Sequence, residues 1–130
     1  MKYYTGVGSR STPPEVLGTM KRLAFHLASS EWILRSGGAD GADMAFQEGA
    51  EDANALMDIY VPWKGFGRQN WGYTPLEYAD PVVRARAEYV VRCVHPAPDH
   101  LSAAALKLHT RNVFQVLGYD LKTPSRFVVC

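Results

Sequence analysis

Two glycine-rich turns, each placed where a short apolar run meets the start of a helix, constrain the fold of this chain most. The first is YTGVGSR, residues 4–10, and the second is LRSGGADGAD, residues 34–43. A strand-to-helix turn without bulky side chains leaves backbone N–H groups exposed at the positive end of the helix, where phosphate or carboxylate binds. On neighbouring parallel strands, the two turns would meet one ligand at the carboxyl edge of a sheet.

Apolar runs alternate with helix signals along the chain. Buried strands are expected over residues 2–7, 32–34, 55–61 and 126–130. Apolar residues at helical spacing predict helices that start at Thr12, at Asp40 or Asp43, at Asp80, and at Asp99 or Ser102, and that extend to Leu27, Ala53, Val94 and Leu117. This order is typical of parallel βαβ units with right-handed crossovers. We therefore expect an α/β protein: one three-layer, Rossmann-like domain over residues 1–130 with a mostly parallel sheet.

Helix ends and helix faces carry finer expectations. Thr12 is placed to cap the first helix, and Glu15 to complete a capping box with it. The inner face of the second helix carries small residues such as Ala42, Ala45 and Gly49, so this helix should lie close to the sheet. The chain ends on the apolar run 126–130. This ending predicts a truncated domain, or one completed by a partner chain such as a second copy in a dimer.

Residues 62–80 mix aromatic residues with glycine and proline, and we expect a long loop there. Its aromatic side chains are Trp63, Phe66, Trp71, Tyr73 and Tyr78. Long loops in compact domains are usually functional or mobile. Two interpretations stay open: a surface loop pinned by its rings, or a lid that stacks on the base of a bound ligand.

The overall charge and the cysteines narrow the class of partner. The 130 residues carry a net charge of +1 with an isoelectric point near 7.8, which argues mildly against duplex DNA as the main partner. No apolar stretch reaches the ~20 residues of a membrane span, and no signal peptide is visible. Cys93 and Cys130 have no metal-ligand spacing and are expected to be reduced thiols in the cytoplasm. We expect no metal, no cofactor and no membrane partner.

The candidate ligand-binding residues of the first turn are Gly6, Gly8, Ser9 and Arg10. Glycines at this place often serve only a tight turn. In the functional interpretation, the Ser9 hydroxyl donates to the ligand and Arg10 makes a bidentate contact with phosphate.

The second turn is the more specific motif, and its candidates are Ser36, Gly37, Gly38, Asp40, Gly41 and Asp43. It matches neither the Walker pattern nor the dinucleotide fingerprint. The glycines would let a phosphate approach the backbone. Each aspartate either caps the helix or accepts hydrogen bonds from a ribose diol or a base amine.

Further candidates lie outside the turns. Arg111 and Asn112 interrupt the apolar face of the last helix and are expected near the ligand. His109 is more simply a helix-face histidine than a base. Glycosidic chemistry would need a carboxylate near the sugar, and the two low-ranked catalytic candidates are Asp43 and Glu48.

Through these residues the chain resembles the SLOG superfamily of Rossmann-like proteins. That group includes the domain of DNA-processing protein A (DprA/Smf) and the "lonely guy" phosphoribohydrolases. The resemblance rests on residues 6–10, 36–43 and 111–112, and it is closest to small phage-borne DprA-like proteins, which share a segment like Tyr60–Lys64 (YVPWK). Family members usually continue into a further Gly-Gly-x-Gly turn and helix, and this sequence lacks that motif.

The resemblance implies a nucleotide or nucleotide-derived ligand such as ADP-ribose, a dimer, and the host cytoplasm as the compartment. Binding of such a ligand at the two glycine turns is the leading hypothesis. One alternative is an enzyme that cleaves the N-glycosidic bond of a nucleoside 5′-monophosphate. Another is a DprA-like module that binds DNA or assists recombination, or an interaction protein that counters host defence.

Overall fold

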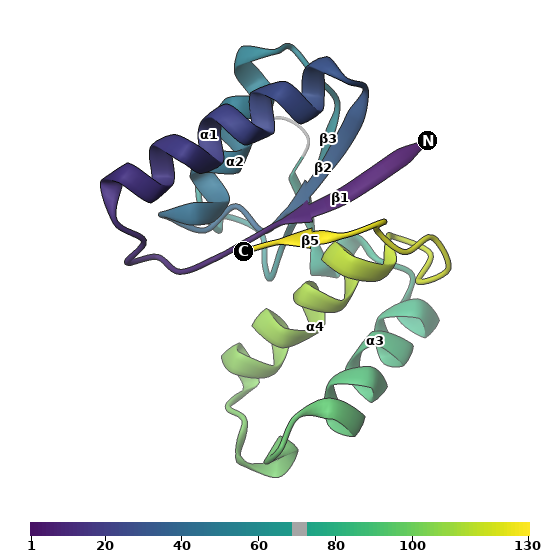
Figure 1. Ribbon diagram of the computed structural model, residues 1–130. Coiled ribbons are helices and arrows are strands. Elements are labelled where there is room, and N and C mark those ends of the chain that lie inside the picture. Colours follow the sequence, from purple (N-terminus) through teal and green to yellow (C-terminus); the bar gives the residue numbers. More distant parts are fainter. Residues whose placement is uncertain (69–72) are drawn as a thin grey trace.

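A computed structural model describes residues 1–68 and 73–130 of the chain, and it has the expected α/β architecture (Figure 1). The described strands form one parallel sheet in the order β4-β3-β2-β1-β5. They are β1 (Lys2–Gly6), β2 (Trp32–Ser36), β3 (Met57–Val61), β4 (Tyr73–Pro75) and β5 (Val128–Val129).

Helices cover both faces of the sheet, which gives three layers (Figure 1). Helices α1 (Pro14–Ser29) and α2 (Ala42–Asp52) pack together on one face. Helices α3 (Pro81–Val94) and α4 (Ala103–Leu117) pack together on the other. Two short 3-10 helices, Leu76–Tyr78 and Pro98–His100, precede α3 and α4.

The order of the strands reverses at β1. Strands β2 and β3 are added on one side of β1, and β5 returns to its other side, where Thr5 pairs with Val128 and Gly6 with Val129. In open α/β sheets, ligands bind beyond the carboxyl ends of the strands at such a reversal. The topology therefore points to the carboxyl ends of β1 and β5.

Each face of the sheet has its own apolar core. Under α1 and α2 the core includes Tyr4, Ala24, Leu34, Phe46 and Ile59; under α3 and α4 it includes Tyr60, Leu76, Ala87 and Phe114. As expected, α2 lies close to the sheet: a Cβ built on Gly6 would lie only 2.6 Å from Cγ of Phe46.

Two of the four expected helix caps are wrong. Helix α1 begins after Pro13 with no side-chain cap, because the Thr12 hydroxyl donates instead to the Ser9 carbonyl at 2.7 Å. Helix α2 begins after Gly41, so neither Asp40 nor Asp43 caps it. The reason is that the Ser9 carbonyl accepts from Ala42 N at 3.2 Å and thereby fixes the start of the helix.

The other two caps are as the sequence suggests. The Asp80 carboxylate accepts from Val82 N and Val83 N at the start of α3. For α4, of the two alternatives, Ser102 is the cap, and its hydroxyl accepts from Ala105 N at 3.1 Å.

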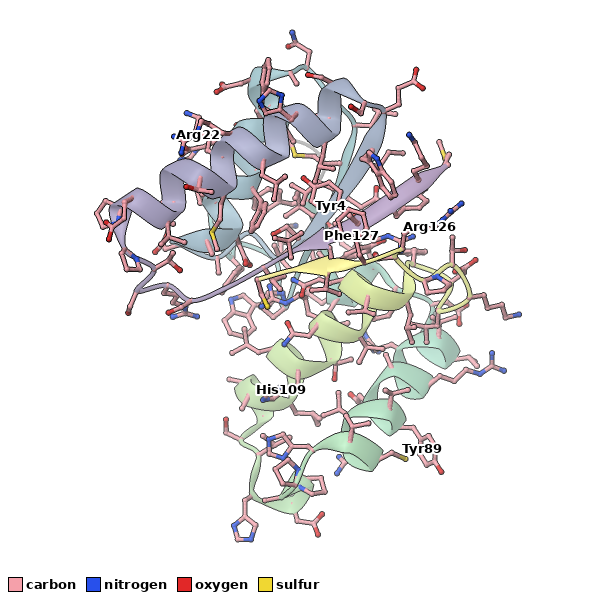
Figure 2. All side chains as sticks on the ribbon, viewed as in Figure 1. Tyr4, Arg22, Tyr89, His109, Arg126 and Phe127 are labelled. Atoms are coloured by element: carbon pink, nitrogen blue, oxygen red, sulfur yellow. The ribbon has the colours of Figure 1, made fainter. Side chains whose placement is uncertain are left out.

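The last strand is shorter and more exposed than expected. Strand β5 consists of Val128 and Val129, which pair in register with Thr5 and Gly6, and Val128 is 49% exposed. Phe127 precedes them and is 38% exposed. Its ring lies 5.7 Å from that of Tyr4 (Figure 2) and 5.0 Å from that of Trp32. These ring contacts position the residue that precedes β5. Strand β5 itself is an edge strand of the sheet.

The expected loop over 62–80 contains the short strand β4, which pairs in parallel with β3 from Ile59↔Tyr73 to Val61↔Pro75. Trp71, one of the aromatic residues expected in this loop, lies outside the described residues. In the part of the chain that the structure describes, no helix has the length and apolar character needed to cross a membrane.

Candidate functional site

A cleft of about 420 Å³ opens at the carboxyl end of β1, where the strand order reverses. It brings together residues from the first glycine turn, the second glycine turn, α4 and β5: Thr5, Val7, Gly8, Arg10, Ala39, Asp43, Arg111, Asn112, Gln115, Val116 and Val128. The predicted convergence of the two turns with Arg111 and Asn112 is therefore present in the fold.

The two glycine turns pack directly against each other. A Cβ built on Gly8 would lie 2.7 Å from Cβ of Ala42, and one on Gly41 would lie 2.6 Å from the Ser9 carbonyl oxygen. Gly41 also has a φ of 79°, which side chains other than glycine rarely adopt. Glycine at these two positions is thus required by the close approach of the turns.

Several predicted binding residues are buried behind the cleft. The Ser36 hydroxyl donates to the Gly6 carbonyl at 2.6 Å and ties β2 to β1. Gly38 is buried, and a Cβ built on it would meet Ile59, Val61 and Tyr73 at 3.2–3.3 Å. These residues shape the turns from within and do not line the cleft.

The Asp43 carboxyl group lies at the inner end of the cleft and is only 5% exposed. Ala39 N donates to its Oδ2 at 3.4 Å, and the backbone N–H groups of Gly8 and Gly37 also stabilise the charged form. Burial nevertheless raises the pKa of Asp43, against the opposing effects of Arg111 and these N–H groups. The N–H groups that the sequence suggested for phosphate thus face a carboxylate of the chain itself.

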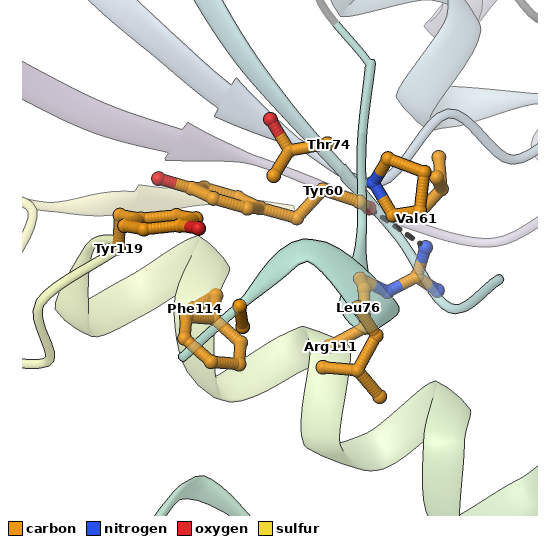
Figure 3. Close-up of a pocket in the computed structure, with 9 residues that line it drawn as sticks. Tyr60, Val61, Thr74, Leu76, Arg111, Phe114 and Tyr119 are labelled. Carbon is orange, nitrogen blue, oxygen red and sulfur yellow. Dashed lines mark hydrogen bonds between the residues drawn. The ribbon is translucent and has the colours of Figure 1, made fainter. Parts of the chain in front are cut away.

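Arg111 projects from α4 into the base of the cleft and is 6% exposed. Its Nη1 donates to the carbonyl oxygens of Gly37 at 2.6 Å and Tyr60 at 3.2 Å. Figure 3 shows the second bond. Burial lowers the pKa of Arg111 to about 10, with the Asp43 carboxylate acting in the opposite direction. The guanidinium therefore stays charged at neutral pH.

The exposed rim of the cleft carries a second cation and an amide. Arg10 lines the cleft and is exposed, and its positive charge contributes to the lowered pKa of Arg111. Asn112 Oδ1 accepts from Arg111 Nε at 2.9 Å. Ser9 and Asp40 are exposed but do not line the cleft, and the Ser9 hydroxyl oxygen accepts from Ser11 N.

The two low-ranked catalytic candidates are not brought together. Glu48 forms ion pairs with Arg68 at 2.7 Å and with Lys21 at 3.8 Å, and it does not line the cleft. Asp43 is the carboxylate that the cleft contains among the described residues.

Sequence reasoning missed Thr5 and Gln115. The Thr5 hydroxyl donates to the Gln115 carbonyl at 2.5 Å and so joins β1 to α4. Gln115 follows Arg111 by four residues, and residues at that spacing share one face of a helix. A helical projection of α4 would therefore have placed Gln115 beside Arg111.

The described residues contain no group of three His, Cys, Asp or Glu side chains arranged to hold a metal ion. No protein-family model, curated protein or solved structure matches this chain at a significant level. The cleft has two guanidinium groups, two carboxamides and one buried carboxyl group, which suit an anionic ligand that also offers a hydrogen-bond donor.

Proposed function

We propose that this protein binds a nucleotide or nucleotide-derived small molecule, such as ADP-ribose, in the cleft between the two glycine turns and α4. The observation that carries the proposal is that two guanidinium groups line the same cleft, the exposed Arg10 at its rim and the buried Arg111 at its base. A buried guanidinium that is held by backbone carbonyls is pre-organised, so it loses little freedom when an anion binds. Asp43 would accept a hydrogen bond from a ribose hydroxyl or a base amine.

A thermal-shift screen against nucleoside mono-, di- and triphosphates, ADP-ribose, NAD and cyclic nucleotides tests this proposal. A ligand at 100 times its Kd adds about 2.7 kcal/mol to the free energy of unfolding. The substitution Arg10→Ala should abolish the shift without unfolding the protein, because Arg10 is exposed.

The matched control is Arg22→Ala, since Arg22 is also exposed but lies on α1, outside the cleft (Figure 2). A shift that survives in Arg10→Ala to the same extent as in Arg22→Ala would contradict binding in this cleft. No shift with any of these compounds would contradict the ligand class.

Hydrolysis of the N-glycosidic bond is a second candidate, and the raised pKa of Asp43 favours it. A carboxyl group with a raised pKa inside a cleft is typical of a general acid or base. We would incubate the protein with AMP and look for free adenine and ribose 5-phosphate. Asp43→Asn should abolish product formation while AMP still binds; loss of binding as well would assign Asp43 to ligand recognition.

The proposal includes three further expectations from the resemblance to the SLOG superfamily: membership of that family, a dimer, and a cytoplasmic site of action. The two cysteines are exposed free thiols, which supports a reducing compartment. Binding to DNA is the less favoured alternative. It would show as an affinity for oligonucleotides that falls steeply with salt.

A further inference from the structure

An apolar groove of about 470 Å³ runs between α3 and α4. Its walls are mostly valine side chains, and Val94 is 74% exposed at its rim. The lining includes Val90, Val94, His95, His109, Val113 and Val116. Figure 2 shows His109 on α4. Exposed valines that gather in a concave surface indicate a place where an apolar group binds.

The groove is continuous with the candidate site. Asn112 and Val116 line both the groove and the cleft, so these two residues form a shared border along α4. On one side of the border lie Arg10, Asp43 and Arg111. On the other side the groove lining contains no Asp, Glu, Lys or Arg side chain. One molecule that spans the border would meet charge at one end and apolar surface at the other.

The Asn112 side chain is oriented for such a molecule. Arg111 Nε can only donate, so the Asn112 oxygen must face it, as the 2.9 Å bond between them requires. The two N–H groups of the Asn112 amide then point away from Arg111. They supply donors at the border for a ligand oxygen or ring nitrogen.

The two histidines add flat surface to the groove. Their rings lie 5.0 Å apart, edge to face. His95 Nδ1 accepts a hydrogen bond from Ala97 N at 3.0 Å, so the proton of the neutral ring is on Nε2. A planar ring that enters between the valines would meet imidazole carbon and this N–H donor.

We propose that the groove between α3 and α4 binds the planar, weakly polar end of the same ligand whose anionic group lies in the cleft. For a nucleotide this end is the base. The inference rests on the proposed function, and it names the part of the protein that distinguishes a nucleotide from a plain sugar phosphate.

Titration calorimetry with AMP and with ribose 5-phosphate tests this inference, because the two probes differ by the base alone. The variant is Val94→Asn, which replaces an exposed groove valine by a polar residue of similar size. The matched control is Val82→Asn, on the same helix at 60% exposure and outside the groove. We expect Val94→Asn to raise the Kd for AMP about fivefold and to leave the Kd for ribose 5-phosphate unchanged. Val82→Asn should change neither Kd.

The other outcomes each overturn a stated claim. If AMP binds with the same Kd to both variants, the groove does not hold the base, and the proposed function still stands. If neither AMP nor ribose 5-phosphate binds the unmodified protein, the inference fails, and the proposed function fails with it only if no compound of the thermal-shift screen binds. If light scattering shows a dimer that Val94→Asn dissociates, a second copy of the chain covers the groove and the inference is wrong.

Discussion

Arg111 joins α4 to the end of β2, because its Nη1 donates to the carbonyl oxygen of Gly37 at 2.6 Å. A Cβ built on Gly37 would lie 2.7 Å from Asp43 Oδ2 and 2.8 Å from Arg111 Nη1, and it would also clash with Gln115 Nε2. The carboxylate and the guanidinium therefore face each other across a position where no side chain fits. This arrangement couples the stability of the second turn to the charge of the cleft.

Arg111→Met should destabilise the fold by about 3 kcal/mol. The substitution keeps most of the side-chain volume but leaves the carbonyl oxygens of Gly37 and Tyr60 without their donor, and it leaves Asp43 without its opposing charge. Urea denaturation followed by circular dichroism measures the change. The control is Arg92→Met on the exposed side of α3, which should cost less than about 0.5 kcal/mol. Equal effects of the two substitutions would contradict the structural role of Arg111.

The pKa of Asp43 predicts how stability depends on pH. Because burial raises this pKa in the folded state, the folded protein holds the proton more tightly than the unfolded chain. The free energy of unfolding therefore falls as the pH rises from about 4, the ordinary range of an aspartate, through the raised pKa. Asp58 titrates in the same direction, since burial raises its pKa too.

The difference between the unmodified protein and Asp43→Asn isolates the contribution of Asp43. Urea denaturation at a series of pH values from 3.5 to 7 should give a flatter profile for Asp43→Asn. The Asp58→Asn variant is the reference for the other buried carboxyl group. Parallel profiles for the unmodified protein and Asp43→Asn would show that the buried carboxyl of Asp43 does not titrate abnormally.

Local patterns predicted the layers and the meeting of the two turns, because they depend on residue types close together in the sequence. The sequence suggested Gly8 and Gly41 as residues that face a ligand, whereas in the fold they allow the two turns to approach each other. The break in the apolar face at Arg111 correctly indicated a residue near the two turns. The parallel order of strands follows from the alternation of strands and helices.

The geometry of the folded turns and the packing of the helices decided what the local patterns missed. Threonine is a residue type that often caps helices, but the hydroxyl of Thr12 donates to the carbonyl oxygen of Ser9 in the first turn instead. The sequence suggested Asp43 as a ligand-binding residue at a helix start. In the fold, burial raises its pKa, although the N–H groups of the turns act in the opposite direction. Glu48 lies on the same helix as Asp43, yet it pairs with Arg68 and Lys21 outside the cleft. The partners of Glu48 are distant in the sequence. Those of Thr12 and Asp43 are close in the sequence, but their positions depend on how the turns fold.

We predict a dimer through the outer edge of β5. Phe127 O and Val129 O accept from Thr5 N and Val7 N of β1, so by strand alternation the N–H and C=O groups of Val128 face away from the sheet. Val128→Pro removes the outward N–H group and keeps the bonds to β1, so it should weaken the dimer. Val128→Thr keeps that N–H group and is the control. Light scattering gives the molar mass, and a monomer at all concentrations of the unmodified protein would contradict the prediction.

Two helical glycines should respond in opposite ways to the same substitution. Gly18 in α1 has open space around it, since the nearest atom to a Cβ built there is Arg22 Nη1 at 3.5 Å. Gly18→Ala should therefore stabilise the protein by about 0.5–1 kcal/mol, the usual gain of alanine over glycine inside a helix. In α2, a Cβ on Gly49 would lie 2.7 Å from Cβ of Ala24 and would collide with the Lys21 carbonyl oxygen of α1. Gly49→Ala should destabilise by about 1–3 kcal/mol, because the backbone of α1 must move. Urea midpoints of the two variants against the unmodified protein measure both signs, and a shift of the same sign in both would contradict the close packing of α1 on α2.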